Sequence, residues 1–598
     1  MADTATTIPL PEYPRPQLVR DSYLCLNGPW TYAITDGRAP ARWDGGILVP
    51  YSPEAALSGV GRRLLPGQTL WYRRGVELPD GFVREGDRLL LHFGAVDQDC
   101  EVRVDGRLVG SNRGGYWPFS LDVTDAFAGP GAHELTVAVR DESDAGFRSR
   151  GKQSLRPGGI WYTPQSGIWQ TVWLEAVPAV RVERIDYRTL LADGMLEVLV
   201  TATADVPVSV EVAAEGAVVA SADGRAGEPL RPPGPEPRLW SPEDPFLYDV
   251  AVTAGADRVR SYAGMRTVSV APDATGIPRL TLNGEPYLHA GVLDQGYWPD
   301  GLYTPPSDEA FVRDILAMKE HGFTMLRKHI KVEALRWYHH CDRLGMLVWQ
   351  DLVNGGRHYN PLVITAPVLT PLRLSDRRHR VFGRQDAEGR REFQEELERT
   401  VTLLSASPAV VCWVPFNEGW GQFDALDAVD RIRALDPDRI VDHASGWHDQ
   451  GGGDLRSLHV YFRRIRPRRS WGRDGRAVVV SEYGGYSHRV PGHGHSDREF
   501  GYRRLRTPEA LAEAFERLHR DEVLPAVRAG LSAIVYTQLA DVEDELNGLL
   551  TADRAVAKLT PSRVRATLDT LRAELASRGA PSSQPDRRVE RTDSPLGG

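Results

Sequence analysis

Two glutamates that each follow a buried-looking apolar run are the residues best suited to chemistry in this chain. Glu418 follows Trp413-Val414-Pro415-Phe416-Asn417, and Glu482 follows Val478-Val479-Val480-Ser481. An apolar, β-branched run of this length is typical of a parallel strand that is covered on both faces. The carboxyl ends of such strands share one rim of an α/β barrel, so we expect the two carboxylates to meet there. Paired carboxylates on one rim are suited to cleaving a glycosidic bond.

The composition fits a large globular protein that does not bind nucleic acid. The 598 residues predict three or four domains. The net charge of −9 argues against a nucleic-acid partner, because neutralising phosphates requires a basic face. Arginines do cluster at 463–469, where a solvated loop is the simpler interpretation and an acidic substrate group is the alternative. Aromatic faces can stack on sugar rings, although most of the 15 Trp and 20 Tyr are expected in cores.

The cysteines and the N-terminal segment indicate in which cellular compartment the protein is expected. The four cysteines at 25, 100, 341 and 412 are scattered and have no metal-ligand spacing, so we expect reduced, buried thiols. Residues 1–20 have no apolar segment typical of a signal peptide, and no run has the length of a membrane span. We therefore expect a cytoplasmic protein with no membrane partner, and we leave open whether it is a homo-oligomer.

The elements that must position the glutamates come after two β-rich regions. Up to residue 179, short alternating runs such as Glu134–Val139 are separated by turns such as Asp105-Gly106, which predicts a jelly-roll β-sandwich. Residues 180–272 repeat this pattern on a smaller scale, as in an immunoglobulin-like β-sandwich. The polar tail 580–598 is expected to be disordered and dispensable.

Residues 273–579 change to alternating strands and helices, which predicts a (β/α)8 TIM barrel. Helices are expected at Asp308–His321, with Ser307 as the cap, at Ala334–Leu344 and at Arg391–Leu404. Short strands are expected at Phe323–Leu326 and Met346–Trp349.

The order of these domains and several short motifs resemble glycoside hydrolase family 2, which includes β-galactosidases, β-glucuronidases and β-mannosidases. The motifs are Leu26–Trp30, Gly167–Leu174, Leu239–Pro242, Leu282–Pro286, Phe416–Glu418 and Ser481–Gly485. The resemblance covers nearly the whole chain, and the ordered set is far more specific than any single motif. It implies a retaining glycosidase that needs no organic cofactor and no metal.

The resemblance also implies roles for individual residues. Glu418 would be the general acid/base, and its apolar neighbours would favour the protonated form that an acid requires. Glu482 would be the nucleophile. Asn417 would hydrogen-bond the sugar 2-OH, and Tyr461 would contact the nucleophile. Arg327 and His329 follow a barrel strand, at positions where the family keeps an Arg and a His. The arginine could donate to the nucleophile and lower its pKa, and a structural ion pair is the alternative interpretation.

Four further residues are expected to contact the sugar, with less support from the pattern. Trp420 follows Glu418 closely. Asp294 and Trp298 follow the first barrel strand, where the family often has Asn and His. Tyr536 stands where many members have a tryptophan under the sugar, so the usual stacking platform is in doubt. The acidic residues at 541–547 are expected to form a solvated turn, with hydroxyl recognition or cation binding as the alternatives. His358 and Tyr359 are expected to form a pocket wall.

The expected function is that of a retaining exo-β-glycosidase that removes a terminal neutral, galactose-like sugar. A β-glucuronidase, a β-mannosidase and an α-L-arabinopyranosidase remain alternatives. A catalytically inactive carbohydrate-binding protein is the alternative from another class. The neutral sugar is favoured because no asparagine here has a lysine two residues on, whereas β-glucuronidases of this family typically carry Asn-x-Lys. Lys328, Lys331 or the arginines at 463–469 could substitute for that lysine.

Overall fold

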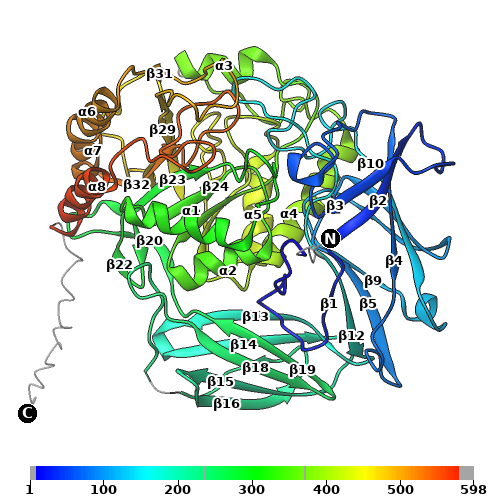
Figure 1. Cartoon of the computed structure of the whole chain (residues 1–598). Coiled ribbons are helices and arrows are strands. Elements are labelled where there is room, and N and C mark those ends of the chain that lie inside the picture. The colour runs from blue at the N-terminus through cyan, green and yellow to red at the C-terminus, as the bar shows by residue number, and fades with distance from the viewer. Residues whose placement is uncertain (1–7, 235, 370–371, 578–598) are drawn as a thin grey trace, which may run out of the picture.

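The computed structural model describes residues 8–234, 236–369 and 372–577. The chain forms a β-sandwich, a smaller β-sandwich and an α/β barrel, which in Figure 1 lie on the right, at the bottom and at the upper left. The predicted fold class is therefore confirmed. The predicted disordered tail, 580–598, lies outside the described residues.

The N-terminal sandwich packs a six-stranded sheet, β3-β2-β4-β10-β7-β8, against a four-stranded sheet, β1-β12-β5-β9. Every second residue of its strands points into the core. In β10, for example, Leu135, Val137 and Val139 are fully buried, and the residues between them are less buried. The strands are β1 Leu24–Cys25, β2 Gly28–Thr35, β3 Gly45–Val49, β4 Thr69–Val76, β5 Asp87–Phe93, β6 Val96–Asp97, β7 Asp99–Val104, β8 Arg107–Arg113, β9 Phe119–Asp122, β10 His133–Arg140, β11 Gly167–Ile168 and β12 Val172–Pro178.

The middle sandwich pairs the sheet β13-β14-β17 with the sheet β16-β15-β18-β19. Its strands are β13 Val182–Leu190, β14 Met195–Ala202, β15 Pro207–Ala214, β16 Ala217–Arg225, β17 Pro229–Leu230, β18 Tyr248–Ala254 and β19 Asp257–Ala263. Arg266, just after β19, donates to the backbone oxygens of Pro408 and Val410, and so ties this domain to the barrel strand that precedes Glu418. A small antiparallel sheet of β20 Val268–Pro272, β21 Pro278–Leu282 and β22 Glu285–Pro286 leads into the barrel.

Eight parallel strands form the barrel in the order β27-β26-β25-β24-β23-β32-β29-β28, which is closed except between β27 and β28. Every residue of β26 and of β29 is buried, as expected for strands covered on both faces. The strands are β23 His289–Asp294, β24 Met325–Lys328, β25 Leu347–Asp351, β26 Val410–Val414, β27 Ile440–Val441, β28 Leu455–Val460, β29 Ala477–Gly484 and β32 Leu531–Thr537, with a side pair of β30 Tyr486–Ser487 and β31 Arg503–Arg504.

The helices are α1 Asp308–Glu320, α2 Leu335–Leu344, α3 Pro361–Leu369, α4 Ala387–Leu404, α5 Ala425–Leu435, α6 Pro508–Leu518, α7 Leu524–Arg528 and α8 Pro561–Ala576. Most of them cover the outside of the barrel. The exception is α3 in the loop after β25, where the backbone oxygen of Val363 contacts Nε2 of His448. Ser307 is the residue before α1, as expected, but its side chain makes no capping hydrogen bond. Within the described ranges, no helix combines the length and the apolar character needed to cross a membrane. The four cysteines are unpaired, and Cys25 alone among them is only half-buried.

Candidate active site

The two glutamates leave neighbouring parts of one barrel rim. Glu482 lies inside β29, and Glu418 lies in the loop after β26. Glu418 has a left-handed backbone, with φ +50°, and Gly419 follows at φ +70°. A Cβ at Gly419 would lie 2.6 Å from Cδ2 of His448, so glycine is needed where the loop turns. The loop thereby returns Glu418 to the rim. Both glutamates are buried there, with exposed fractions of 6 % for Glu418 and 4 % for Glu482.

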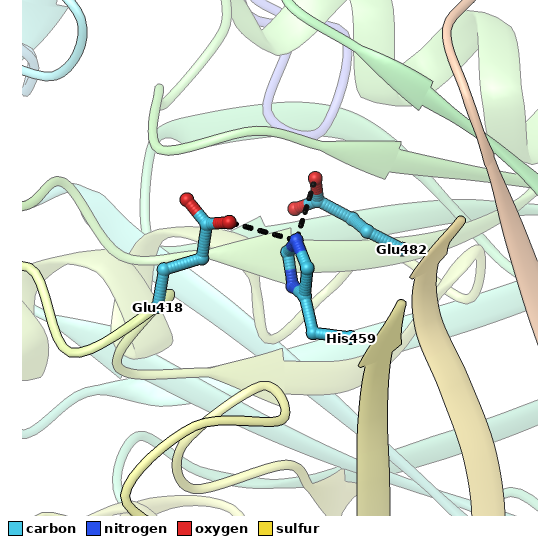
Figure 2. A group of neighbouring side chains, drawn as sticks. All are labelled: Glu418, His459 and Glu482. Carbon is cyan, nitrogen blue, oxygen red and sulfur yellow. Dashed lines mark ion pairs between the residues drawn. The ribbon is translucent and has the colours of Figure 1, made fainter. Parts of the chain in front are cut away.

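The carboxylates meet at a histidine. One oxygen of Glu418, one oxygen of Glu482 and a ring nitrogen of His459 all lie within 4.8 Å of one another. Nε2 of His459 is 2.7 Å from Oε1 of Glu418 and 3.5 Å from Oε2 of Glu482. Figure 2 marks both ion pairs with dashed lines. The two glutamates that the sequence singled out are therefore brought together, and a third titratable group stands between them.

Arg327 organises one side of the pair from β24. Its guanidinium donates to both oxygens of Asp351, at 2.9 and 3.1 Å, and to Oε1 of Glu482 at 3.2 Å. Nη2 also donates to Oδ1 of Asn417 at 2.9 Å. This fork fixes the asparagine amide, and Nδ2 of Asn417 has no hydrogen-bond partner in the part of the chain that the structure describes.

Glu482 is surrounded by groups that favour its charged form. The Tyr461 hydroxyl donates to Oε2 at 2.5 Å, and the Tyr461 ring stacks on Tyr502 with centroids 3.6 Å apart. Burial by itself would raise the pKa of the Glu482 carboxyl, but His459, Arg327 and the tyrosine hydroxyl outweigh it and hold that pKa below its usual range.

His329 is a second histidine close to Glu482. Its Nδ1 contacts Oδ2 of Asp351 at 2.9 Å and lies 3.9 Å from Oε1 of Glu482. Burial nevertheless lowers the pKa of His329 well below its usual range. His329 is therefore neutral at physiological pH and acts as a hydrogen-bonding group beside the nucleophile position.

The trio of Glu418, His459 and Glu482 also offers the nitrogen and oxygen donors that zinc accepts. Ligands placed tetrahedrally at 2.0–2.1 Å from a metal lie about 3.3 Å apart. The 2.7 Å contact between His459 and Glu418 is shorter, which is the separation of an ion pair in direct contact. The pair therefore has the spacing of an ion pair rather than that of two ligands on one zinc ion.

The N-terminal sandwich contributes to the walls of the site. Trp161 packs on Trp420, with ring centroids 5.1 Å apart, and a cavity of about 500 Å³ lies beside Trp161, His358 and Tyr359. Lys152 places its ammonium 5.6 Å from the Trp420 ring centroid. The predicted wall of His358 and Tyr359 thus faces a second wall from another domain.

A larger cavity of about 670 Å³ lies elsewhere. Its lining comes from all three domains and includes Trp173, Arg184 and Leu335, but neither glutamate. The cavity beside Trp161 is not lined by either glutamate. We place the chemistry at the barrel rim because the paired carboxylates are there.

Three of the residues expected to contact the sugar have partners inside the protein, and their sugar contacts stay predictions. Asp294 is paired with Lys328, at 2.7 Å, and the Trp298 ring packs edge-on against Phe311. The Tyr536 ring packs against Tyr483 and Phe515. No contact with either glutamate is recorded for these three residues in the described ranges. Trp420 and Tyr461, in contrast, are at the rim.

The acidic loop after β32 joins two domains. Oε2 of Glu545 accepts from the Tyr162 hydroxyl at 2.5 Å, and Oε1 of Glu543 accepts from the backbone N–H of Thr163 at 2.8 Å. Asp541 is paired with Lys558 at 2.6 Å. Glu543 and Glu545 hold the barrel against the N-terminal sandwich, whereas Asp541 is paired within the barrel domain. Neither a solvated turn nor a hydroxyl-binding loop predicts this role.

Several residues of the site carry no sequence signal that we recognised. His459 and Tyr502 lie in ordinary-looking segments, and Asp351 ends a strand without any motif. Lys152 belongs to a different domain, about 270 residues before Glu418 in the chain. One available signal was the rarity of lysine, since the chain has lysine only at 152, 319, 328, 331 and 558.

Comparison with protein families agrees with this architecture. Residues 65–178 match the sugar binding domain of glycosyl hydrolases family 2, residues 180–266 match the family's next domain, and residues 304–465 match its TIM barrel domain. The chain belongs to glycosyl hydrolases family 2. The resemblance drawn from the sequence motifs is therefore confirmed.

Relatives within the family are distant. A β-galactosidase of Thermoanaerobacter pseudethanolicus is 27 % identical over 333 residues, which are 52 % of this chain and 43 % of the relative. A β-galactosidase of Halalkalibacterium halodurans is 24 % identical over 493 residues, which are 71 % of this chain and 44 % of the relative. The chain thus spans less than half the length of these two relatives.

Solved structures with the family fold match over nearly their whole length. A β-D-glucuronidase of Dictyoglomus thermophilum has a TM-score of 0.73 at 17 % identity, with 93 % of this chain and 98 % of that chain covered. A β-galacturonidase from Eisenbergiella tayi, bound to galacturonate, has a TM-score of 0.67 at 19 % identity, with 92 % and 97 % covered. At these identities the likeness establishes the fold alone.

Proposed function

We propose that this chain is a retaining exo-β-glycosidase that works by double displacement. The observation that carries the proposal is the carboxylate pair, with oxygens of Glu418 and Glu482 within 4.8 Å of each other. Retaining enzymes keep the two carboxyl groups about 5–5.5 Å apart, whereas inverting enzymes need about 6.5–9.5 Å to admit a water molecule. The pair has the shorter spacing.

In the proposed mechanism, an oxygen of Glu482 attacks the anomeric carbon while Glu418 protonates the departing oxygen. The bond from the sugar to its leaving group breaks, and a covalent glycosyl-enzyme forms. Glu418 then takes a proton from water as that water attacks the same carbon and releases Glu482. The unpartnered Nδ2 of Asn417 is available to donate to the sugar 2-OH.

The roles of the two glutamates are separable by leaving group. We expect Glu482→Ala to abolish turnover of all aryl glycosides, because no covalent intermediate can form. We expect Glu418→Ala to keep the glycosylation step on dinitrophenyl glycosides, whose leaving group needs no proton. Pre-steady-state release of dinitrophenol measures that step directly. Equal losses of the step in both variants would contradict the assignment.

For the sugar we propose a neutral, galactose-like ring. Lys328 and Lys331 are both neutralised by Glu333, at 3.2 and 2.6 Å, and Lys328 also by Asp294. The arginines at 463–469 are exposed to solvent, as the simpler interpretation expected. These groups, which could have replaced the missing Asn-x-Lys motif, are therefore occupied or solvated.

A uronate is the second candidate, and one observation favours it. Lys152 is only 5 % exposed, and its ammonium lies over the rings of Tyr162 and Trp420. Its charge acts on the buried carboxylate of Asp351, but in the described part of the chain it forms no ion pair in direct contact. A buried cation without a carboxylate in direct contact is suited to an anion that arrives with the substrate.

A substrate panel separates the two candidates. We expect kcat/KM to be higher for aryl β-D-galactoside or α-L-arabinopyranoside than for aryl β-D-glucuronide. A glucuronide preference of tenfold or more, about 1.4 kcal/mol in transition-state binding, would overturn the neutral sugar. Loss of that preference in Lys152→Met, with Lys319→Met as the control distant from the pair, would then identify the carboxylate clamp.

A further inference from the structure

His459 is the side chain through which the two carboxylates communicate. It lies near the end of β28, beside β29 with its Glu482, and its side chain is 0 % exposed. Nε2 faces both carboxylates, at 2.7 Å from Glu418 and 3.5 Å from Glu482 (Figure 2). It is the third titratable member of the pair, and the family resemblance gave it no role.

Packing, rather than hydrogen bonding, holds the ring in this position. The imidazole packs against the rings of Trp447 and Tyr461, with centroids 5.2 and 5.1 Å away. A Cβ at Gly446 would lie 2.5 Å from Cβ of His459, and Gly446 has φ +98°, so only glycine fits beside that Cβ. Within the described residues neither ring nitrogen makes an aligned hydrogen bond. Nε2 is the nitrogen at ion-pair distance from the carboxylates.

Charged groups face His459 from three strands or their loops. Glu418 follows β26, Glu482 lies in β29, and Arg327 and His329 end β24, while the Tyr461 hydroxyl approaches from its own segment. Burial disfavours the imidazolium, but the two carboxylates outweigh burial and Arg327, so the pKa of His459 is raised above its usual value. The carboxylates therefore favour the protonated form of His459, whereas burial favours the neutral form of His329.

We propose that His459 is a positioning residue that shares one proton with Glu418 through the catalytic cycle; this inference rests on the proposed retaining mechanism. Before glycosylation the proton passes from Nε2 to Glu418, and Glu418 gives a proton to the departing oxygen as the bond to the leaving group breaks. His459 is then neutral and Glu418 is ionised. In the second step Glu418 takes a proton from the attacking water, and Nε2 takes it back. One proton leaves the pair and one returns, so the cycle balances.

Sharing the proton changes the pH dependence in a defined direction. Because the pKa of His459 is raised, the pair keeps its last proton to higher pH than an isolated glutamate would. When the leaving group is poor, kcat/KM should fall at high pH as the pair of Glu418 and His459 loses its last proton. This fall is the basic limb of the pH profile. We expect His459→Asn to move this limb to lower pH by one unit or more. With dinitrophenyl glycosides, which need no proton in glycosylation, the limb should not move.

Tyr461→Phe is the matched control. It removes a contact to Glu482 and none to Glu418, so it should lower the rate without moving the limb. An unchanged limb in His459→Asn on poor leaving groups would overturn the inference. So would an equal shift on both classes of leaving group, which a merely structural role would produce. Wild-type turnover with a retained anomer would still support the proposed function in either case.

A direct titration tests the inference without activity. In protein labelled with ¹⁵N-histidine, the His459 signal is identified by its loss in His459→Asn. Its pKa should fall in Glu418→Gln, since a carboxylate at 2.7 Å is replaced by a neutral amide. A His459 pKa that is unchanged in Glu418→Gln would overturn the shared proton even if the chain hydrolysed no glycoside.

Discussion

At the scale of single residues, Arg327 links more of the site than any other side chain described above. One guanidinium orients Asn417, contacts Glu482 and is itself held by both oxygens of Asp351. An ammonium group has no planar fork, so lysine cannot make these bonds together. Charge-assisted hydrogen bonds contribute about 1.5–3 kcal/mol each. The arrangement explains why an arginine, rather than just a positive charge, is needed at this position.

We therefore expect Arg327→Lys to lower kcat/KM by about 100-fold or more, which corresponds to about 2.7 kcal/mol. The control is Arg279→Lys in β21, a buried arginine paired with Asp273 outside the site. It should leave kcat/KM within about threefold of wild type, if the variant folds as judged by its thermal unfolding. Equal losses in the two variants would assign Arg327 to folding rather than to the site.

At the scale of elements, the loop after β32 is a joint between domains. The Tyr162 hydroxyl donates to Glu545, which is 1 % exposed and also accepts from Asn547 at 2.9 Å. Removing the hydroxyl leaves one oxygen of a buried carboxylate without that donor, a cost of about 1–3 kcal/mol. The loop therefore stabilises the position of the N-terminal sandwich, including Lys152 and Trp161, on the barrel.

Tyr162→Phe should lower the midpoint of thermal unfolding by a few degrees and raise KM for aryl glycosides, because the domain that carries Lys152 is less firmly held. The control is Tyr23→Phe, whose hydroxyl donates to backbone oxygens at 3.1 Å near the surface and lies outside this joint. A Tyr162→Phe variant with unchanged midpoint and unchanged KM would contradict a role for the loop as a joint.

Prediction from sequence worked where local pattern decides structure. The apolar spacing in Asp308–His321 predicted α1 to within one residue at its end, because one face of that helix is buried against the barrel. The glutamates followed from apolar strands and short motifs. The helix α3 at Pro361–Leu369 was missed, because its run is almost entirely apolar and contains Pro367 and therefore shows no helical periodicity.

Contacts between distant segments could not be read in the same way. His459 reaches Glu418 because β26 and β28 stand near each other at the rim, and Lys152 reaches the site because a separate domain docks there. The family position suggested that Tyr536 lies under the sugar, but its ring packs against α6 through Phe515. Which face of a strand a ring occupies depends on packing against the neighbouring elements, which a motif does not specify.

At the scale of the whole molecule, a buried charge cluster joins the N-terminal segment to both sandwiches. Glu175 in β12 pairs with Arg15 at 3.1 Å and Arg20 at 3.4 Å, and Arg20 also pairs with Asp257 in β19 at 2.8 Å. Burial would raise the pKa of Glu175, but Arg15, His92 and Arg20 outweigh it and hold that pKa below its usual range. The ionised carboxylate therefore stabilises the folded arrangement.

Glu175→Gln should be strongly destabilising at neutral pH. Breaking a buried pair costs about 3–5 kcal/mol, so we expect the first unfolding midpoint to fall by at least about 5 °C. Because the folded pKa is below that of the unfolded chain, the stabilisation is complete above about pH 4.3 and is lost as the pH falls through the folded pKa. The difference from wild type should shrink at acid pH. Glu134→Gln, whose partner Arg73 is 3.8 Å away at the surface, is the control. A pH-independent difference would contradict this account of Glu175.

The anomeric configuration of the first product tests the central claim most directly. An aryl β-glycoside that the chain hydrolyses is followed by ¹H NMR from the first minutes, before mutarotation mixes the anomers. A carboxylate pair with oxygens within 4.8 Å predicts that the β-anomer of the sugar forms first and the α-anomer later. Initial formation of the α-anomer would mean that water attacks directly, and it would contradict Glu482 as a nucleophile and the double displacement with it.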